Sequence, residues 1–158
     1  MDLLPFFRWC DSTWLSVTIR ESRVLFPIIE ALHLVGITLL LGTTLIVDIR
    51  LFNLGMRQQK VPSLASQLAP WNLASLVVVV ATGIMLFLSE AMKCYASGPF
   101  QVKMLLLFLA ILFQFTVYRR FTESEKTRFT PAKSWGLGLT SLCLWFGVGL
   151  AGRAIGFF

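Results

Sequence analysis

Two residues that could do chemistry lie in a run that is otherwise apolar. Glu30 precedes His33 by three positions, and His33 is the one histidine of the chain. Residues at i and i+3 share a face of a helix, so the two side chains would be neighbours. Ionisable groups are costly in hydrocarbon and commonly mark a functional site there. The pair therefore predicts either a cofactor ligand or part of a paired polar cluster.

As a cofactor site the pair is incomplete. One histidine cannot supply both axial ligands of a haem b within one chain, so a haem would need a symmetric dimer or a methionine partner such as Met85, Met92 or Met104. A Glu-x-x-His motif binds two irons only with a second copy and further glutamates. A single copper or zinc ion would rest on His33 with Glu30 and a cysteine, although the cysteines have no metal-ligand spacing.

The elements that must position this pair are long apolar helices. The chain has 158 residues, of which 56% are hydrophobic and only 14% charged, whereas soluble domains are typically about 25% charged. Four blocks can reach the roughly 20 residues needed to span a bilayer. We expect an all-α fold, a four-helix transmembrane bundle over 26–158, with helices at about 27–50, 68–92, 99–121 and 132–157.

The first 25 residues have a different pattern, in which Trp and Phe alternate loosely with charged residues. This pattern predicts an amphipathic helix over 1–25 that lies in the membrane interface. No cleavable signal peptide is expected, so the first span would act as its own insertion signal. Ser63 is a candidate cap for the second helix.

The sequence places one of the three cysteines within a predicted span and the other two outside the spans. Cys143 falls in the middle of the fourth predicted span, where it would be a small buried residue. Cys10 and Cys94 fall on the same side of the membrane, where they would be either bonded to each other or unpaired.

The net charge of +6 comes from basic residues that flank the apolar blocks. This distribution favours membrane lipids as partners and argues against nucleic acid, which requires a basic stripe on a polar surface. More Lys and Arg fall in the two loops between 50–60 and 119–133 than elsewhere. By the positive-inside rule, we expect a multi-pass protein of the bacterial inner membrane with both termini outside.

With this topology, all four helices bring an ionisable group to one level near the outer leaflet. Because a helix rises about 1.5 Å per residue, the distance of each ionisable group from the outer end of its helix puts all of them at similar depths. We expect Glu30 to pair with Arg153 or Lys103, because mutual pairing is the cheapest way to hold charges in an apolar setting. The alternative is that these side chains snorkel to headgroups. The expected polar cluster is Glu30, His33, Glu90, Lys103 and Arg153.

Asp48 and Arg50 form a second candidate pair at the other end of the first helix. The pair would either close on the second helix through Trp71, close on Arg119, or simply end the helix as a solvated pair.

Several stretches resemble an uncharacterised family of bacterial four-helix integral membrane proteins. They are 30–36, 47–55, 82–91, 100–103, 144–145 and 152–155, so that the resemblance covers nearly the whole chain. It implies that the motif positions of the family are Glu30, His33, Asp48, Arg50, Glu90, Lys103, Trp145 and Arg153. Such proteins often have an Asn and a His late in the third helix, where this chain has Gln114 and Tyr118. A more distant likeness is to copper-resistance-type four-helix proteins of the inner membrane.

The chain contains no nucleophile triad, phosphate-binding loop or dinucleotide fingerprint. We therefore expect a non-enzymatic component or accessory subunit of a membrane assembly, acting as a homo-oligomer or within a larger complex. The alternative is a haem- or metal-binding membrane redox protein that uses His33 as a ligand.

Overall fold

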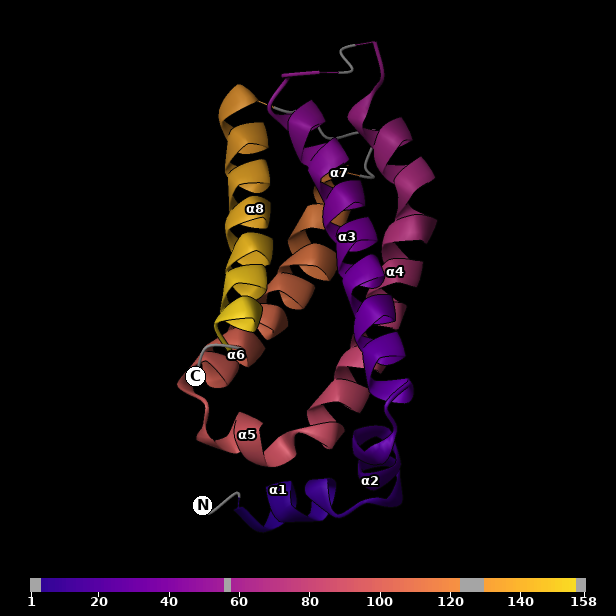
Figure 1. The fold of residues 1–158 in the computed structure, drawn as a ribbon. Coiled ribbons are helices and arrows are strands. Elements are labelled where there is room, and N and C mark those ends of the chain that lie inside the picture. Colours follow the sequence, from indigo (N-terminus) through magenta and orange to yellow (C-terminus); the bar gives the residue numbers. More distant parts are fainter. Residues whose placement is uncertain (1–3, 56–57, 123–129, 156–158) are drawn as a thin grey trace.

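The computed structural model describes residues 4–55, 58–122 and 130–155. Within them, four helices are long and apolar enough to cross a membrane. They are α3 (Leu25–Leu51), α4 (Val61–Ser89), a continuous third span and α8 (Pro131–Ala154). The third span consists of α6 (Gly98–Phe113), the π-helical turn η1 (Gln114–Tyr118) and α7 (Arg119–Thr122). The expected all-α four-helix bundle of a multi-pass membrane protein is confirmed (Figure 1).

The four spans pack as two pairs. α3 lies along α4, α6 lies along α8, and α3 joins the pairs by packing on α8. α4 meets the third span chiefly at α7. We call the end where α3 stops and α4 begins the loop end, and the opposite end the α5 end (Figure 1). One core cluster lies toward the loop end around Val47 and Tyr118, and a second lies mid-bundle around Leu40 and Trp145.

A Schellman motif ends α3. Asn53 has φ 58°, and its N–H donates to the Arg50 carbonyl while the Leu54 N–H donates to the Ile49 carbonyl. These two bonds satisfy carbonyls that a helix end leaves without partners, and Asn is one of the few residues that tolerate the left-handed region. The helix is thus stopped by Asn53, not by charged residues.

The second span starts earlier than expected, at Val61 rather than near residue 68. Its N-cap is Lys60, and Pro62 lies in the first turn, where the missing N–H costs nothing. Ser63 is therefore inside the helix and does not cap it. The span ends at Ser89, because Glu90 leaves the helical region with φ −132° and ψ 33°. The short helix α5 (Ala91–Ala96) then crosses toward α6.

Two short helices occupy the N-terminal segment in place of the single interfacial helix expected. α1 (Leu4–Asp11) and α2 (Trp14–Glu21) are separated by Thr13, whose side chain accepts a hydrogen bond from the Ser16 N–H and caps α2. α1 packs on α5, and α2 packs on α4 (Figure 1). The fully buried Ser16 hydroxyl donates to the Leu88 carbonyl at 2.8 Å. The segment is therefore part of the bundle's packing, although Trp9 and Trp14 remain exposed.

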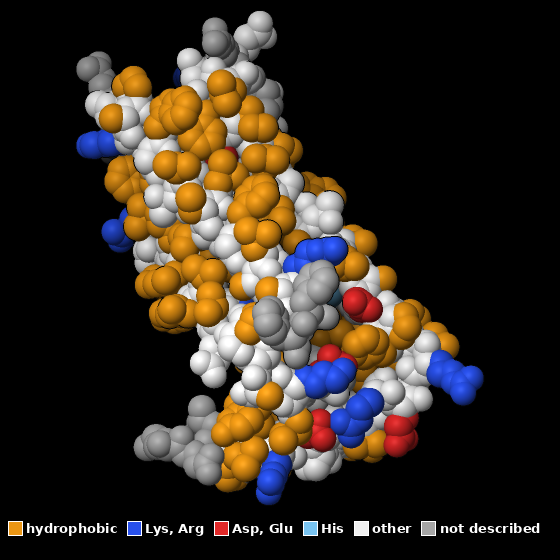
Figure 2. Space-filling view, turned by 60° about the vertical axis from the view of Figure 1, so that its left-hand side comes forward, with side chains coloured by type: hydrophobic (Ala, Val, Ile, Leu, Met, Phe, Trp, Pro, Cys, Tyr) orange, Lys and Arg blue, Asp and Glu red, His pale blue; other side chains and the backbone are white. Residues whose placement is uncertain are grey.

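Hydrophobic side chains dominate the surface of the spans, and acidic and basic side chains gather toward the α5 end (Figure 2). Cys143 belongs to this outward surface, so the expectation that it is buried is wrong. Its position on α8 faces away from the stripe formed by Ser134, Leu137, Ser141 and Trp145, which faces the core. Cys10 and Cys94 are buried free thiols. Burial raises the pKa of both, and the charge of Glu90 raises the pKa of Cys94 further.

A candidate polar site at the loop end

The most buried ionisable group of the described residues is Asp48, with no exposed surface. It occupies a core position of α3, on the same stripe as Leu40, Thr44 and Leu51. The Tyr118 hydroxyl donates to Asp48 Oδ1 at 2.8 Å. Ser141 of α8, also fully buried, lies next to the carboxyl without completing a hydrogen bond. Asp48, Tyr118 and Ser141 thus bring three spans together, and we call them the Asp48 centre.

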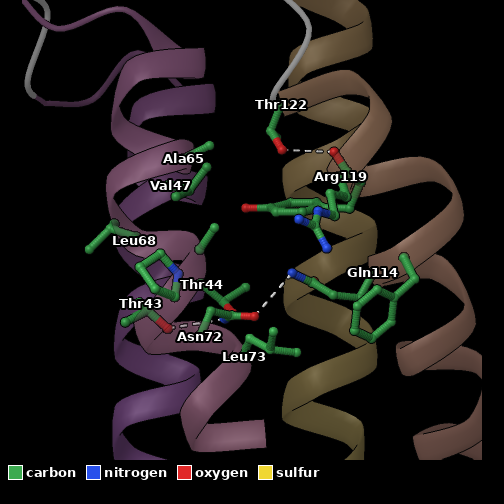
Figure 3. Close-up of a pocket in the computed structure, with 14 residues that line it drawn as sticks. Thr43, Thr44, Val47, Ala65, Leu68, Asn72, Leu73, Gln114, Arg119 and Thr122 are labelled. Atoms are coloured by element: carbon green, nitrogen blue, oxygen red, sulfur yellow. Dashed lines mark hydrogen bonds between the residues drawn. The ribbon is translucent and has the colours of Figure 1, made fainter.

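Beside the Asp48 centre lies a pocket of about 310 Å³ between the α3–α4 pair and the end of the third span (Figure 3). Its size is at the lower end of the range for small-molecule sites. Tyr118 lines the pocket and is hydrogen-bonded to Asp48, which is not one of the lining residues. The lining combines polar and apolar side chains, contributed by Thr43, Thr44, Val47, Ala65, Leu68, Ala69, Pro70, Asn72, Leu73, Gln114, Phe115, Tyr118, Arg119 and Thr122.

A hydrogen-bonded chain of amides and hydroxyls crosses this pocket. Asn72 Nδ2 donates to the hydroxyls of Thr43 and Thr44, each at 3.0 Å. Gln114 Nε2 donates to Asn72 Oδ1 at a longer 3.4 Å (Figure 3). The threonine hydroxyls donate back to carbonyls of their own helix. Interhelical bonds of this kind hold membrane helices together.

Both walls of the pocket contain an interruption of regular helix. Pro70 lies inside α4, where it cannot donate to the carbonyl four residues earlier. Opposite it, η1 replaces one α-helical turn of the third span with a π turn, and the Arg119 N–H donates to the Gln114 carbonyl. Single π turns inside helices are frequent at functional sites. Here the π turn positions Gln114, Tyr118 and Arg119 at the pocket.

Several buried polar atoms near this end lack a hydrogen-bond partner among the described residues. They are Asp48 Oδ2, Gln114 Oε1 and Ser141 Oγ, and Trp145 Nε1 in the mid-bundle cluster is a further such atom. Buried polar groups are nearly always hydrogen-bonded, so each such atom calls for water, a ligand or a functional explanation.

At the α5 end, the structure places His33 in a specific contact. His33 Nδ1 and the Thr82 hydroxyl are 2.8 Å apart, and the ring lies against Gly83, on which a Cβ would be 3.3 Å from His33 Cε1. Lys103 is close enough for its charge to act on this ring. The Lys103 side chain also passes over Gly152, with Nζ 3.5 Å from where a Cβ would lie.

The remaining charges of the predicted cluster are not brought into one network. Glu30 is exposed and forms no ion pair with a described residue. Glu90 instead forms a salt bridge with Lys93, its neighbour at i+3. Arg153 is exposed in the last turn of α8. The expected pairing of Glu30 with Arg153 or Lys103 is therefore wrong in this structure, because Glu30 faces outward from α3.

The expected second pair also does not form. Asp48 turns into the core, whereas Arg50 Nε donates to the Gln59 carbonyl at 2.7 Å and Nη1 donates to Asn53 at 3.3 Å. Residues at i and i+2 of a helix do not face each other, so Asp48 is buried in the core while the half-buried Arg50 faces the loop. The interpretation of both residues as a solvated helix stop is thus wrong for Asp48.

Sequence reasoning missed most of the pocket. Asn72 and Gln114 are uncharged, so they did not stand out beside the acids and bases, although polar residues in apolar spans are themselves a signal. In the sequence, Gln114 and Tyr118 are distinctive only as departures from the family pattern. Within the described residues, no three His, Cys, Asp or Glu side chains converge on a point that would hold a metal ion.

The fold and the Asp48 centre define a small four-span membrane protein in which buried polar side chains connect the spans. The chain belongs to a family of unknown function, DUF6644, whose profile matches residues 6–158. The resemblance to an uncharacterised family is thereby confirmed. No curated protein and no solved structure matches the chain.

Proposed function

We propose that the protein is a non-enzymatic component of a membrane assembly, acting as a homo-oligomer or as an accessory subunit of a larger complex. The observation that supports this is the outward face of the third span. Its exposed residues Val102, Leu105, Leu109 and Leu112 are spaced three, four and three apart. That spacing forms a seam along one side of a helix, as at helix–helix contacts in coiled coils.

A cysteine cross-linking experiment in native membranes tests the assembly. Leu105→Cys places a thiol on the seam, and the natural Cys143 on the outward surface of α8 is a control in the same molecule. Oxidation is expected to give a discrete cross-linked product that depends on Leu105→Cys. A product that forms equally well through Cys143 would reflect random collision. Native mass spectrometry that finds only monomer without a stoichiometric partner would contradict the proposal.

We further propose that the loop end faces the cytoplasm of a bacterial cell, with both termini outside. Basic residues at the loop end support this orientation by the positive-inside rule. Those within the described residues are Arg50, Lys60, Arg119, Arg120 and Lys133. Reporter fusions after Ala96 and after Asn53 are expected to be active outside and inside, respectively. The reverse pattern would overturn the orientation.

A second candidate is haem or metal binding through His33. The observation in its favour is the contact of Nδ1 with Thr82, which fixes the ring and leaves Nε2 as the nitrogen for a ligand bond. A haem would then take its second axial ligand from a second copy of the chain or from a methionine. The visible spectrum of the purified protein decides: a Soret band that His33→Ala abolishes supports this candidate, and a colourless, metal-free protein refutes it.

A further inference from the structure

We infer that Asp48 is a proton-binding site: the closed bundle holds it as a neutral carboxylic acid whose Oδ2–H donates to the Ser141 hydroxyl, and release of that proton loosens the loop end. This inference goes beyond the assembly role and does not depend on it. It rests on three properties of the Asp48 centre: its burial, the charges around it, and two oxygens that lack partners.

The burial of Asp48 favours the uncharged form of its carboxyl. The residue has no exposed surface, although it lies in the last turn of α3. An ionised carboxylate in an apolar interior is costly unless a cation pairs with it, and such a group usually becomes neutral instead. Asp48 forms no ion pair with a described residue. The hydrogen bond from the neutral Tyr118 hydroxyl offsets only part of that cost.

The elements around Asp48 do not bring a cation to it. The whole of α4 contains no acidic or basic residue. Within the described part of the loop end, the other titratable or charged residues are Arg50, Lys60, Tyr118, Arg119, Arg120 and Lys133. Of these, Tyr118 is the one that hydrogen-bonds to Asp48. Arg50 donates to a loop carbonyl, and the other four basic residues are exposed.

A proton on Oδ2 supplies the partner that two buried oxygens lack. Asp48 Oδ2 and Ser141 Oγ have no hydrogen-bond partner among the described residues, and both side chains are fully buried. Other hydroxyls of the spans donate to carbonyls of their own helix, as Thr44 and Thr140 do, whereas Ser141 does not. A carboxylic acid is both donor and acceptor. Oδ2–H can therefore donate to Ser141 while Oδ1 accepts from Tyr118.

Release of the proton reverses the direction of one hydrogen bond. The Oδ2–H bond breaks, the proton passes to water at the loop end, and the electron pair stays on the carboxylate. The Ser141 hydroxyl then donates to Oδ2, while Tyr118 still donates to Oδ1. The carboxylate is left without a counter-ion where α3 packs on α8, and this favours entry of water. Loss of the proton thus loosens the contacts of three spans, and its return closes them.

Infrared spectroscopy of the full chain in lipid nanodiscs at neutral pH tests for the acid. We expect the carbonyl band of a protonated carboxylic acid, which shifts in heavy water and is absent from Asp48→Asn. Glu30→Gln is the matched control, because it removes an exposed acid from the same helix and should leave the band in place. Absence of the band from the wild-type protein overturns the proposal. A band that appears in choline chloride but is replaced by carboxylate in sodium chloride also overturns it, with sodium as the occupant.

A pair of serine variants tests the acceptor of the proton. Ser141→Ala removes the partner of Oδ2–H, so the band is expected to persist and move to higher frequency. Ser75→Ala removes another buried serine, which donates to carbonyls of its own helix, and should leave the frequency unchanged. An unchanged band in folded Ser141→Ala overturns the assigned hydrogen bond.

The pH dependence of unfolding gives the sign of the effect. An Asp in an unfolded chain loses its proton at about pH 4. Above that pH the folded protein holds one proton more than the unfolded chain, so the folding constant should fall about tenfold per pH unit until the folded protein also releases its proton. Asp48→Asn is expected to lack this contribution. A wild-type stability that instead rises with pH relative to Asp48→Asn shows an ionised carboxylate and overturns the proposal.

Discussion

The two ends of the bundle handle polar residues in opposite ways. At the α5 end, Glu30 and Arg153 are exposed, and Glu90 pairs locally with Lys93. At the loop end, Asp48 is fully buried and bonded to Tyr118, seventy residues away. Charges near helix ends reach water or headgroups at little cost. A carboxyl on a core stripe cannot, so it must find partners on other helices. The number of charges is therefore a poor guide to which end carries the specific interactions.

The largest expected effect tests this contrast directly. Asp48→Ala removes the acceptor of the buried Tyr118 hydroxyl and leaves a cavity, so we expect a loss of about 2–3 kcal/mol in the free energy of unfolding. Glu30→Ala, the matched change of an exposed acid on the same helix, is expected to cost less than about 0.5 kcal/mol. Unfolding in mixed micelles measures both. Similar losses from the two changes would remove the contrast between the ends.

A second test measures how strongly Asp48 and Tyr118 interact at the loop end. A double-mutant cycle with Asp48→Asn and Tyr118→Phe is expected to give an interaction energy of about 1 kcal/mol, because the two side chains share one buried hydrogen bond. Purely additive changes would mean that each residue acts only through packing. The cycle is measured by the same unfolding assay.

The contact between His33 and Thr82 is expected to be weaker. Thr82→Val removes the hydroxyl while keeping the shape, and interhelical hydrogen bonds in membranes average about 0.6 kcal/mol. We therefore expect a loss of that size. Thr82→Ser, which retains the hydroxyl, is the control. A loss of unfolding free energy larger than that of Asp48→Ala would place the dominant polar contact at the α5 end and contradict the contrast between the two ends.

The smallest effect is expected for Glu30 and Arg153. Glu30 forms no ion pair with a described residue, so Glu30→Gln and Arg153→Gln should be additive within about 0.3 kcal/mol. Thermal unfolding of the two single variants and the double variant in detergent is the measurement. A double change that costs clearly less than the sum would show that the two groups interact.

Parts of the candidate site were within reach of sequence reasoning. Asp48 and His33 were both singled out, because an ionisable residue in an apolar run is conspicuous. Their partners were not, since Tyr118 and Thr82 are ordinary residues whose role depends on which helix faces which. Similarly, the end of α3 at Asn53 depends on backbone angles, whereas the sequence suggests the charged residues Asp48 and Arg50, in the last turn of α3, as an equally plausible end.

The sequence by itself determined that this is a multi-pass all-α protein, because four long apolar blocks satisfy their backbone hydrogen bonds in a bilayer only as helices. Hydropathy depends on composition along the chain, and folding does not alter it. Only the tertiary structure decided which polar residues meet. Rotation of each helix about its axis buried Asp48 and turned Glu30 outward, and the π turn and Pro70 opened a pocket between helices distant in sequence. Those outcomes arise from packing between helices, which no single segment specifies.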